Sequence, residues 1–283
     1  MARSTDISPL SQVLFRADAV ADGARLPDTI ATGFQSLDRV LGGGLRGGDL
    51  VVLGGDVGSG KSALALALAM RVAQRRSPVV FFSGEMSVDR LLERALAIEG
   101  RVKIDDLRAG VVNDIARASV GAAAVRLRDV LPRFEVIPMD GLAGVFECVQ
   151  GVRPELVVLD SLQSLLRGER STTDEELADA VRRLKTFAIQ QGVAIVVTAQ
   201  LPHLVVRDDR RPSLDDFGAM GAVKHHADVV LALFREDMYD RRRELEGATE
   251  LLVRKNRNGS TGYVDLYFYA QWMRFEDMLD PDR

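Results

Sequence analysis

The sequence is poor in cysteine and lysine, and it has no apolar run long enough to span a membrane. Its single cysteine, Cys148, excludes an internal disulfide and a cluster of thiolate metal ligands. The first ten residues lack the apolar segment of a signal peptide. We therefore expect a cytoplasmic location and no membrane partner.

The chain also lacks the excess of positive charge that many nucleic-acid-binding proteins carry. Its 37 basic and 41 acidic residues give a net charge of -4. Any contact with DNA or RNA is therefore expected from local basic loops. Only five basic positions are lysine, and two of these, Lys61 and Lys255, lie in the motifs described below. With 283 residues and 47% hydrophobic content, the chain can bury one large core.

A glycine-rich loop follows the apolar run Leu50–Leu53, an expected buried strand, and precedes a helix rich in alanine and leucine. The loop matches G-x-x-x-x-G-K-[ST] and consists of Gly55, Asp56, Val57, Gly58, Ser59, Gly60, Lys61 and Ser62. Its glycines let main-chain N–H groups turn inward, toward the positive end of the helix dipole. The pattern predicts a phosphate site in which Lys61 reaches the outer phosphates and Ser62 holds Mg²⁺. The alternative is a glycine-rich turn that only connects strand and helix.

Two carboxylates come at the ends of expected buried strands. Glu85 follows the run Val79–Ser83, and Asp160 ends the run Leu156–Asp160. Beside a phosphate loop, Glu85 is placed to act as a general base toward the attacking water, although it could also be a helix-capping acid. Asp160 is predicted to hold a metal-bound water as the second group of the magnesium site.

The next strand, Val193–Thr198, is followed by Gln200, whose amide we expect to sense the γ-phosphate. On the helix before this strand, the apolar residues form one stripe, and Lys185 is expected to point away from it.

Three further strands are expected, over 228–234, 250–254 and 263–269, of which the first should be parallel and buried. The Asn-Gly pair between the last two predicts a hairpin. Lys255 and Arg257 are two residues apart in it and so project to one side. Such a pair suits the γ-phosphate of a neighbouring subunit, unless it is simply a solvated tip.

Two polar loops, 167–174 and 202–216, are predicted to be exposed. Their arginines are candidates for contact with DNA, namely Arg167, Arg170, Arg207, Arg210 and Arg211. The alternative is a solvated surface, because the acidic residues of the second loop offset its arginines.

These patterns predict an α/β fold whose mostly parallel twisted sheet is flanked by helices and ends in an antiparallel hairpin. Residues 1–28 are interpreted as an arm with a short helix that must pack on this subunit or a neighbour. Residues 29–275 form the expected core domain and 276–283 a tail.

Taken in order, several short motifs resemble the carboxyl-terminal motor domain of DnaB-type replicative helicases over about residues 29–275. They are Thr32-Gly33-Phe34, Leu37-Asp38, the phosphate loop, Phe82-Ser83-Gly84-Glu85-Met86, Leu159-Asp160-Ser161-Leu162-Gln163, Ala199-Gln200-Leu201, Arg211-Pro212, Asp215, Ala227-Asp228-Val229-Val230 and Lys255-Asn256-Arg257-Asn258-Gly259. Only the phosphate loop is specific by itself; the ordered set is highly specific.

The resemblance implies a RecA-like fold and a ring-forming, usually hexameric, ATPase that moves on single-stranded DNA in replication. It implies ATP and Mg²⁺ as ligands, with Glu85 activating water and Asp160 supporting the metal. Gln200 would couple hydrolysis to DNA, and Lys255 with Arg257 would complete the next subunit's site. The loops at 167–174 and 202–216 would face the ring's channel. Loader or primase proteins are further implied partners.

The sequence departs from the family in two respects. DnaB-type helicases normally carry an additional amino-terminal helical domain, for which only a short arm is present here. The region 104–153 matches weakly, and the glycine-rich segments at 42–44 and 58–60 are similar to the RadA and KaiC branches of RecA-like ATPases. A recombination or regulatory ATPase, or a nucleotide-dependent assembly module without unwinding activity, therefore remains as an alternative.

Overall fold

A nine-stranded sheet forms the centre of the computed structural model, which describes residues 9–21, 29–111, 113–166, 173–201, 209–240 and 245–278. The strand order is β11-β10-β9-β8-β3-β7-β6-β4-β5. The strands are β3 (Leu50–Gly55), β4 (Val79–Ser83), β5 (Phe134–Pro138), β6 (Leu156–Asp160), β7 (Ala194–Gln200), β8 (Val229–Arg235), β9 (Ala248–Asn256), β10 (Gly262–Tyr269) and β11 (Arg274–Asp277). The six strands from β8 to β5 are parallel, and β9, β10 and β11 are antiparallel. This arrangement confirms the predicted fold class.

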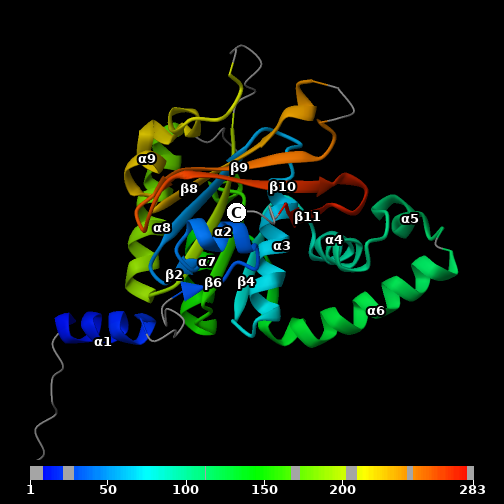
Figure 1. Ribbon diagram of the computed structural model, residues 1–283, viewed down its shortest axis with the longest axis horizontal. Helices are drawn as coiled ribbons and strands as arrows, with labels where there is room; N and C mark the ends of the chain where they lie inside the picture. Colours follow the sequence, from blue (N-terminus) through cyan, green and yellow to red (C-terminus); the bar gives the residue numbers. More distant parts are fainter. Residues whose placement is uncertain are drawn as a thin grey trace, which may run out of the picture.

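Helices cover both faces of the sheet (Figure 1). The α-helices of the described residues are α1 (Pro9–Ala21), which lies apart from the sheet, α2 (Gln35–Val40), α3 (Lys61–Gln74), α4 (Val88–Gly100), α5 (Ile104–Ala109), α6 (Asp114–Val130), α7 (Gly141–Val152), α8 (Asp174–Gln191) and α9 (Ala222–His226). One core lies between the sheet and α2, α3, α4 and α6, and the other between the sheet and α7, α8 and α9. Because side chains alternate along a strand, Val51 packs in the first core and Val52 in the second. A small ladder of β1 (Thr29–Ile30) and β2 (Leu45–Arg46) lies outside this sheet.

The register of the parallel strands brings the predicted site residues to one edge. Gly55 pairs with Gln200, and Ser83 pairs with Asp160. In parallel α/β sheets, ligands bind outside the carboxyl ends of the strands. The hairpin of β9 and β10 turns at the opposite edge, since Asn256 pairs with Val229 at the start of β8.

The predictions for the arm, the two polar loops and the side chain of Lys185 have different outcomes. The predicted helix of the arm forms as α1, but Leu10, Val13 and Leu14 are all more than half exposed, so its packing partner stays a prediction. The predicted loops lie partly outside the described residues, which exclude 167–172 and 202–208. The orientation expected for Lys185 is wrong, because its side chain is only 15% exposed and its Nζ donates to Asp228 Oδ2 at 2.6 Å. In the described part of the chain, no helix has the length and apolarity needed to cross a membrane.

Candidate active site

The predicted phosphate loop connects β3 to α3 at the carboxyl edge of the sheet. Gly58 and Gly60 have φ values of +79° and +102°, in the left-handed region that side chains disfavour. The positive φ of Gly60 turns the chain directly into α3, whose first N–H groups have no partner inside the helix. The loop therefore has the local geometry that binds phosphate.

A cavity of ≈ 420 Å³ lies beside this loop. It is lined by the loop, by the strand ends and by the segment around β10 and β11, and its polar residues are Lys61, Ser62, Glu85, Arg94, Asp160, Ser161, Thr198, Gln200 and Arg235. Five of the eight predicted loop residues, Val57, Gly58, Gly60, Lys61 and Ser62, therefore line one cavity together with Glu85 and Asp160.

Asp160 is the most deeply buried acid of the cavity, with 2% exposure. Its Oδ1 accepts hydrogen bonds from Thr198 Oγ1 at 2.6 Å and Ser62 Oγ at 3.1 Å. Its Oδ2 is buried and has no hydrogen-bond donor among the described residues. Burial raises the pKa of Asp160, and the two hydroxyl groups oppose that shift. A buried carboxylate oxygen without a donor, beside a serine hydroxyl, fits an oxygen-seeking cation such as Mg²⁺.

Glu85 enters the cavity from the end of β4. Gly84 allows this approach, since a Cβ there would lie 2.3 Å from Ser164 Cβ. The N–H of Gly84 donates to the carbonyl of Asp160 at 2.7 Å, which joins the end of β4 to the end of β6. Ser161 Oγ then donates to Glu85 Oε1 at 2.8 Å and orients the carboxylate. This bond is between side chains 76 residues apart in sequence, so sequence reasoning did not find it.

The side chain of Lys61 is held by the main chain of the phosphate loop. Its Nζ donates to the carbonyl of Asp56 at 2.7 Å. Burial lowers the pKa of Lys61, and the charges of Asp160, Asp56 and Glu85 oppose that shift.

Asp56 is itself anchored by two donors. They are Val57 N–H at 2.6 Å and the hydroxyl of Tyr239 at 2.8 Å. Tyr239 therefore supports the phosphate loop, which the sequence motif did not indicate.

Gln200 lies at the exposed end of β7 and borders the same cavity. Its backbone exchanges two hydrogen bonds of 3.3 Å with the side chain of Gln163. Gln163 lies just beyond Asp160, the last residue of the neighbouring strand β6. The predicted sensor is thus tied to the segment that carries the predicted metal ligand.

The wall across from the strand ends is apolar and was not predicted. It consists of Phe268, Ala270 and Met273. The guanidinium of Arg235 lies 4.7 Å from the centre of the Phe268 ring and pairs with Asp237 at 2.8 Å. The Phe268 ring also stacks on Phe275 at 4.4 Å between ring centres and is only 6% exposed, so Arg235 covers what remains of it.

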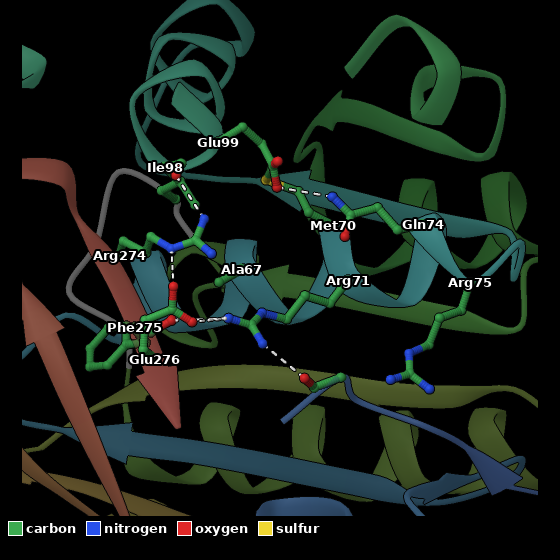
Figure 2. A pocket seen from close by; sticks show the side chains of 11 residues that line it. Ala67, Met70, Arg71, Gln74, Arg75, Ile98, Glu99, Arg274, Phe275 and Glu276 are labelled. Carbon is green, nitrogen blue, oxygen red and sulfur yellow. Dashed lines mark hydrogen bonds and ion pairs between the residues drawn. The ribbon is translucent and has the colours of Figure 1, made fainter. Parts of the chain in front are cut away.

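A second cavity, of ≈ 320 Å³, lies between α3, α4 and β11 (Figure 2). Arg71 and Arg274 both pair with Glu276, while Glu99 accepts a hydrogen bond from Gln74 and pairs with Arg126. None of the predicted site residues lines it.

Comparison with known proteins identifies the family. A model described as the DnaB-like helicase C terminal domain matches residues 29–277. The chain belongs to this family.

Curated relatives of this DnaB-like domain are named as replicative DNA helicases. The DnaC helicase of Bacillus subtilis is 30% identical over 261 residues, and the DnaB helicase of Treponema pallidum is 33% identical over 255 residues. These alignments cover 88% and 87% of this chain but only 56% and 55% of the relatives. The chain thus spans about half the length of the curated relatives it matches.

Solved structures agree on the RecA-like fold. A structure described as an ATPase domain superposes with a TM-score of 0.87 at 22% identity, covering 98% of this chain and 100% of that chain. A DnaB-like replicative helicase, solved in work on its interactions with primase, gives 0.86 at 21% identity, covering 99% of this chain and 68% of that chain. A KaiC-like protein from Pyrococcus horikoshii gives 0.62 at 17% identity, covering 89% of this chain and 100% of that chain.

In this DnaB-like domain, Lys255 and Arg257 lie at the edge of the sheet opposite the cavity. Lys255 Nζ donates to the carbonyl of Lys224 at 2.7 Å, and Arg257 donates to the carbonyl of His225 at 2.7 Å. Arg257 also pairs with Asp228 at 3.1 Å and keeps 47% of its side chain exposed. Both cations lie on one side, as their spacing predicts, where they contact the carboxyl end of α9, and neither lines the cavity.

Of the arginines predicted to contact DNA, Arg167, Arg170 and Arg207 lie outside the described residues. Arg210 lies 5.3 Å from the ring centre of Tyr239. Arg211 forms a two-pronged ion pair with Glu250, which raises its pKa. A DNA-binding role for these residues stays a prediction.

Proposed function

We propose that this chain is an ATP-driven motor of the DnaB type, which moves on single-stranded DNA and separates strands in replication. The observation that carries the proposal is the buried, donor-free Oδ2 of Asp160 next to Ser62, in a cavity that also holds Lys61 and Glu85. Phosphate-binding, metal-binding and proton-accepting groups then occur in one site, as ATP hydrolysis requires.

Each residue has a distinct part in the proposed reaction. The loop N–H groups and Lys61 bind the phosphates, and Ser62 and Asp160 would hold Mg²⁺, which would supply positive charge to the phosphate oxygens. Glu85, oriented by Ser161, accepts a proton from the water that attacks the γ-phosphorus, while the bond from that phosphorus to the bridging oxygen breaks and the oxygen leaves with ADP. Gln200 links the site to the DNA-facing loops.

Lys255 and Arg257 are proposed to act on the nucleotide of a neighbouring subunit in a hexameric ring. Their location supports this role, because they lie at the edge of the sheet opposite their own cavity and Arg257 keeps 47% of its side chain exposed. A cation supplied from a neighbour can stabilise the charge of the transition state. Single-stranded DNA, and loader or primase proteins, complete the proposed partners.

The test is a mixing experiment with two inactive variants, Lys61→Ala and Arg257→Ala, assayed for ATP turnover with and without single-stranded DNA. A mixed ring contains interfaces in which an intact loop meets an intact arginine, so turnover should return on mixing. Arg182→Ala is the matched control, because Arg182 is an exposed arginine that pairs with nearby Asp179 on its own helix.

Two results would contradict the proposal. Turnover that does not return on mixing would exclude a site shared between subunits. Turnover that single-stranded DNA does not stimulate in an assembled ring would favour the nucleotide-dependent assembly module instead.

A further inference from the structure

Lys185 lies on α8, and its ammonium group meets a buried carboxylate instead of solvent. Its side chain is 15% exposed, and its Nζ donates to Asp228 Oδ2 at 2.6 Å and to the carbonyl of Gly48 at 2.8 Å. Asp228 is 5% exposed. Burying an ion pair costs desolvation energy, which is offset only when the remaining polar atoms of the pair are also bonded. The other partners of Asp228 therefore show what this pair holds in place.

Asp228 holds Arg257 with its second oxygen. Its Oδ1 accepts from Arg257 Nη1 at 3.1 Å, and its carbonyl accepts from the main-chain N–H of Arg257 at 2.9 Å. Arg257 Nη2 also donates to the carbonyl of His225 at 2.7 Å. The main chain and the guanidinium of this arginine are thus bonded at three points to the segment where α9 leads into β8.

Arg257 keeps donors for an acceptor outside its own subunit. A guanidinium has five N–H groups, and the side-chain bonds to Asp228 and His225 use two of them. Among the described residues, none accepts a bond from the other three. The guanidinium is therefore fixed in orientation, while N–H groups that can bond phosphate oxygens stay available.

The other oxygen of Asp228 is fully used. Oδ2 accepts from Leu50 N–H at 2.8 Å as well as from Lys185 Nζ. Each carboxylate oxygen has two lone pairs, so Oδ2 has none left for a third donor. Lys185 thus restricts Asp228 to holding Arg257 through Oδ1 alone.

The pair of Arg211 with Glu250 shows the alternative arrangement. There, both carboxylate oxygens accept, one from Nε and the other from Nη2. An arginine bound in this two-pronged way has given up the paired N–H groups with which it would bind a phosphate. Without Lys185, Asp228 would be free to bind Arg257 in the same way.

We propose that Lys185 is a positioning residue for Arg257: by occupying Oδ2 of Asp228, it limits that carboxylate to a single bond with the guanidinium and leaves the remaining N–H groups to the nucleotide of a neighbouring subunit. This inference rests on the proposed function, since Arg257 acts there in the neighbour's site. Lys185 itself touches no nucleotide and acts only through Asp228.

The test uses Lys185→Met, which keeps an unbranched side chain of similar length and removes its charge. ATP turnover is measured for this variant alone, mixed with Lys61→Ala and mixed with Arg257→Ala. We expect turnover of the variant alone to fall about tenfold or more, because a small displacement of a group that stabilises a transition state is costly. Turnover should return on mixing with Lys61→Ala, which supplies an intact arginine, and not on mixing with Arg257→Ala.

Two further measurements separate positioning from general stability. Calorimetric titration with Mg²⁺ and a non-hydrolysable ATP analogue should give Lys185→Met an affinity within about twofold of wild type, because its own phosphate loop is intact. Lys185→Arg should recover part of the turnover, since it keeps a cation beside Asp228. Lys103→Met is the matched control, because Lys103 is an exposed lysine just before α5, and it should match wild type.

The outcomes separate this inference from the function beneath it. Suppose that Lys61→Ala and Arg257→Ala restore each other, but Lys61→Ala does not restore Lys185→Met. The inference is then overturned and the proposed function stands. Unchanged turnover in Lys185→Met, restoration by Arg257→Ala, or an affinity for the analogue that falls as much as turnover would have the same meaning. If Lys61→Ala and Arg257→Ala do not restore each other, both are overturned.

A second variant decides if Lys185→Met melts below the assay temperature. Combining it with Asp228→Asn leaves no buried carboxylate without its counter-charge. Asparagine has one acceptor oxygen in its side chain, so it cannot serve both Leu50 N–H and Arg257 as the carboxylate does. We expect the melting temperature to return toward wild type, while turnover stays low and is restored by Lys61→Ala. Wild-type turnover in this double variant would overturn the inference.

Discussion

The two ends of the parallel strands differ in how completely their polar groups are paired. At the carboxyl edge, Ser59 Oγ, Arg94 Nε and Asp160 Oδ2 are buried without hydrogen-bond partners among the described residues. At the opposite edge, Arg133 Nε just before β5 also has no partner among the described residues, but Asp228 is 5% exposed and both of its carboxylate oxygens are bound. The difference indicates which end binds a ligand, because buried polar groups in folded proteins are otherwise satisfied.

Asp228 also connects the two ends. Its Oδ2 accepts from Leu50 N–H at 2.8 Å, at the start of the strand that leads to the phosphate loop, and from Lys185 Nζ at 2.6 Å. Its Oδ1 accepts from Arg257 at 3.1 Å. The arginine proposed to serve a neighbour is thus fixed to the strand that carries its own subunit's loop.

The largest effect is expected at the unpaired end. Glu85→Gln removes the proposed proton acceptor, so ATP turnover should fall about 10²-fold or more, while affinity for a non-hydrolysable ATP analogue stays within about twofold. Steady-state turnover and calorimetric titration measure the two quantities. Glu147→Gln, at an exposed position on α7, serves as the control. Loss of both quantities together would show that Glu85 maintains the site rather than the reaction.

A smaller effect is expected at the paired end. Asp228→Asn retains an oxygen for Leu50 N–H but leaves Lys185 and Arg257 without their counter-charge, so the free energy of unfolding should fall by about 3 kcal/mol. Urea denaturation measures this change. Asp179→Asn breaks an exposed pair on α8 and should change stability by less than about 1 kcal/mol. Equal effects of the two variants would contradict the contrast between the edges.

The smallest effect concerns the anchor of the phosphate loop. Tyr239→Phe removes the hydroxyl bond to Asp56 and should lower the free energy of unfolding by about 1 kcal/mol, whereas Tyr263→Phe, at a half-exposed position, should not. Burial and this bond raise the pKa of Tyr239 to about 12.

The same pKa fixes a pH dependence. Because the folded chain retains the Tyr239 proton above the unfolded pKa of about 10, the bond's contribution is present below pH 10 and is lost as pH rises toward 12. The stability difference between wild type and Tyr239→Phe should therefore shrink over that range. A difference independent of pH would exclude the hydroxyl as its source.

The strands and the strand-end residues could be predicted because their signals are local. Glu85, Asp160 and Gln200 each follow an apolar run, and parallel strands bring such positions to one edge. Arg94 and Tyr239 could not be predicted in this way, since no periodicity distinguishes them from other residues of a helix or a turn. Lys185 was assigned to the solvent face by helical period, but its long side chain reaches Asp228, 43 residues away.

The sequence by itself determined the phosphate loop, the alternation of strands and helices, and the membership of a DnaB-like family. Only the tertiary structure decided which polar atoms are paired and which are left to bind a ligand. The physical reason is distance along the chain: Ser62 meets Asp160 across 98 residues, and the burial that leaves one oxygen of Asp160 unpaired arises only when those segments pack together.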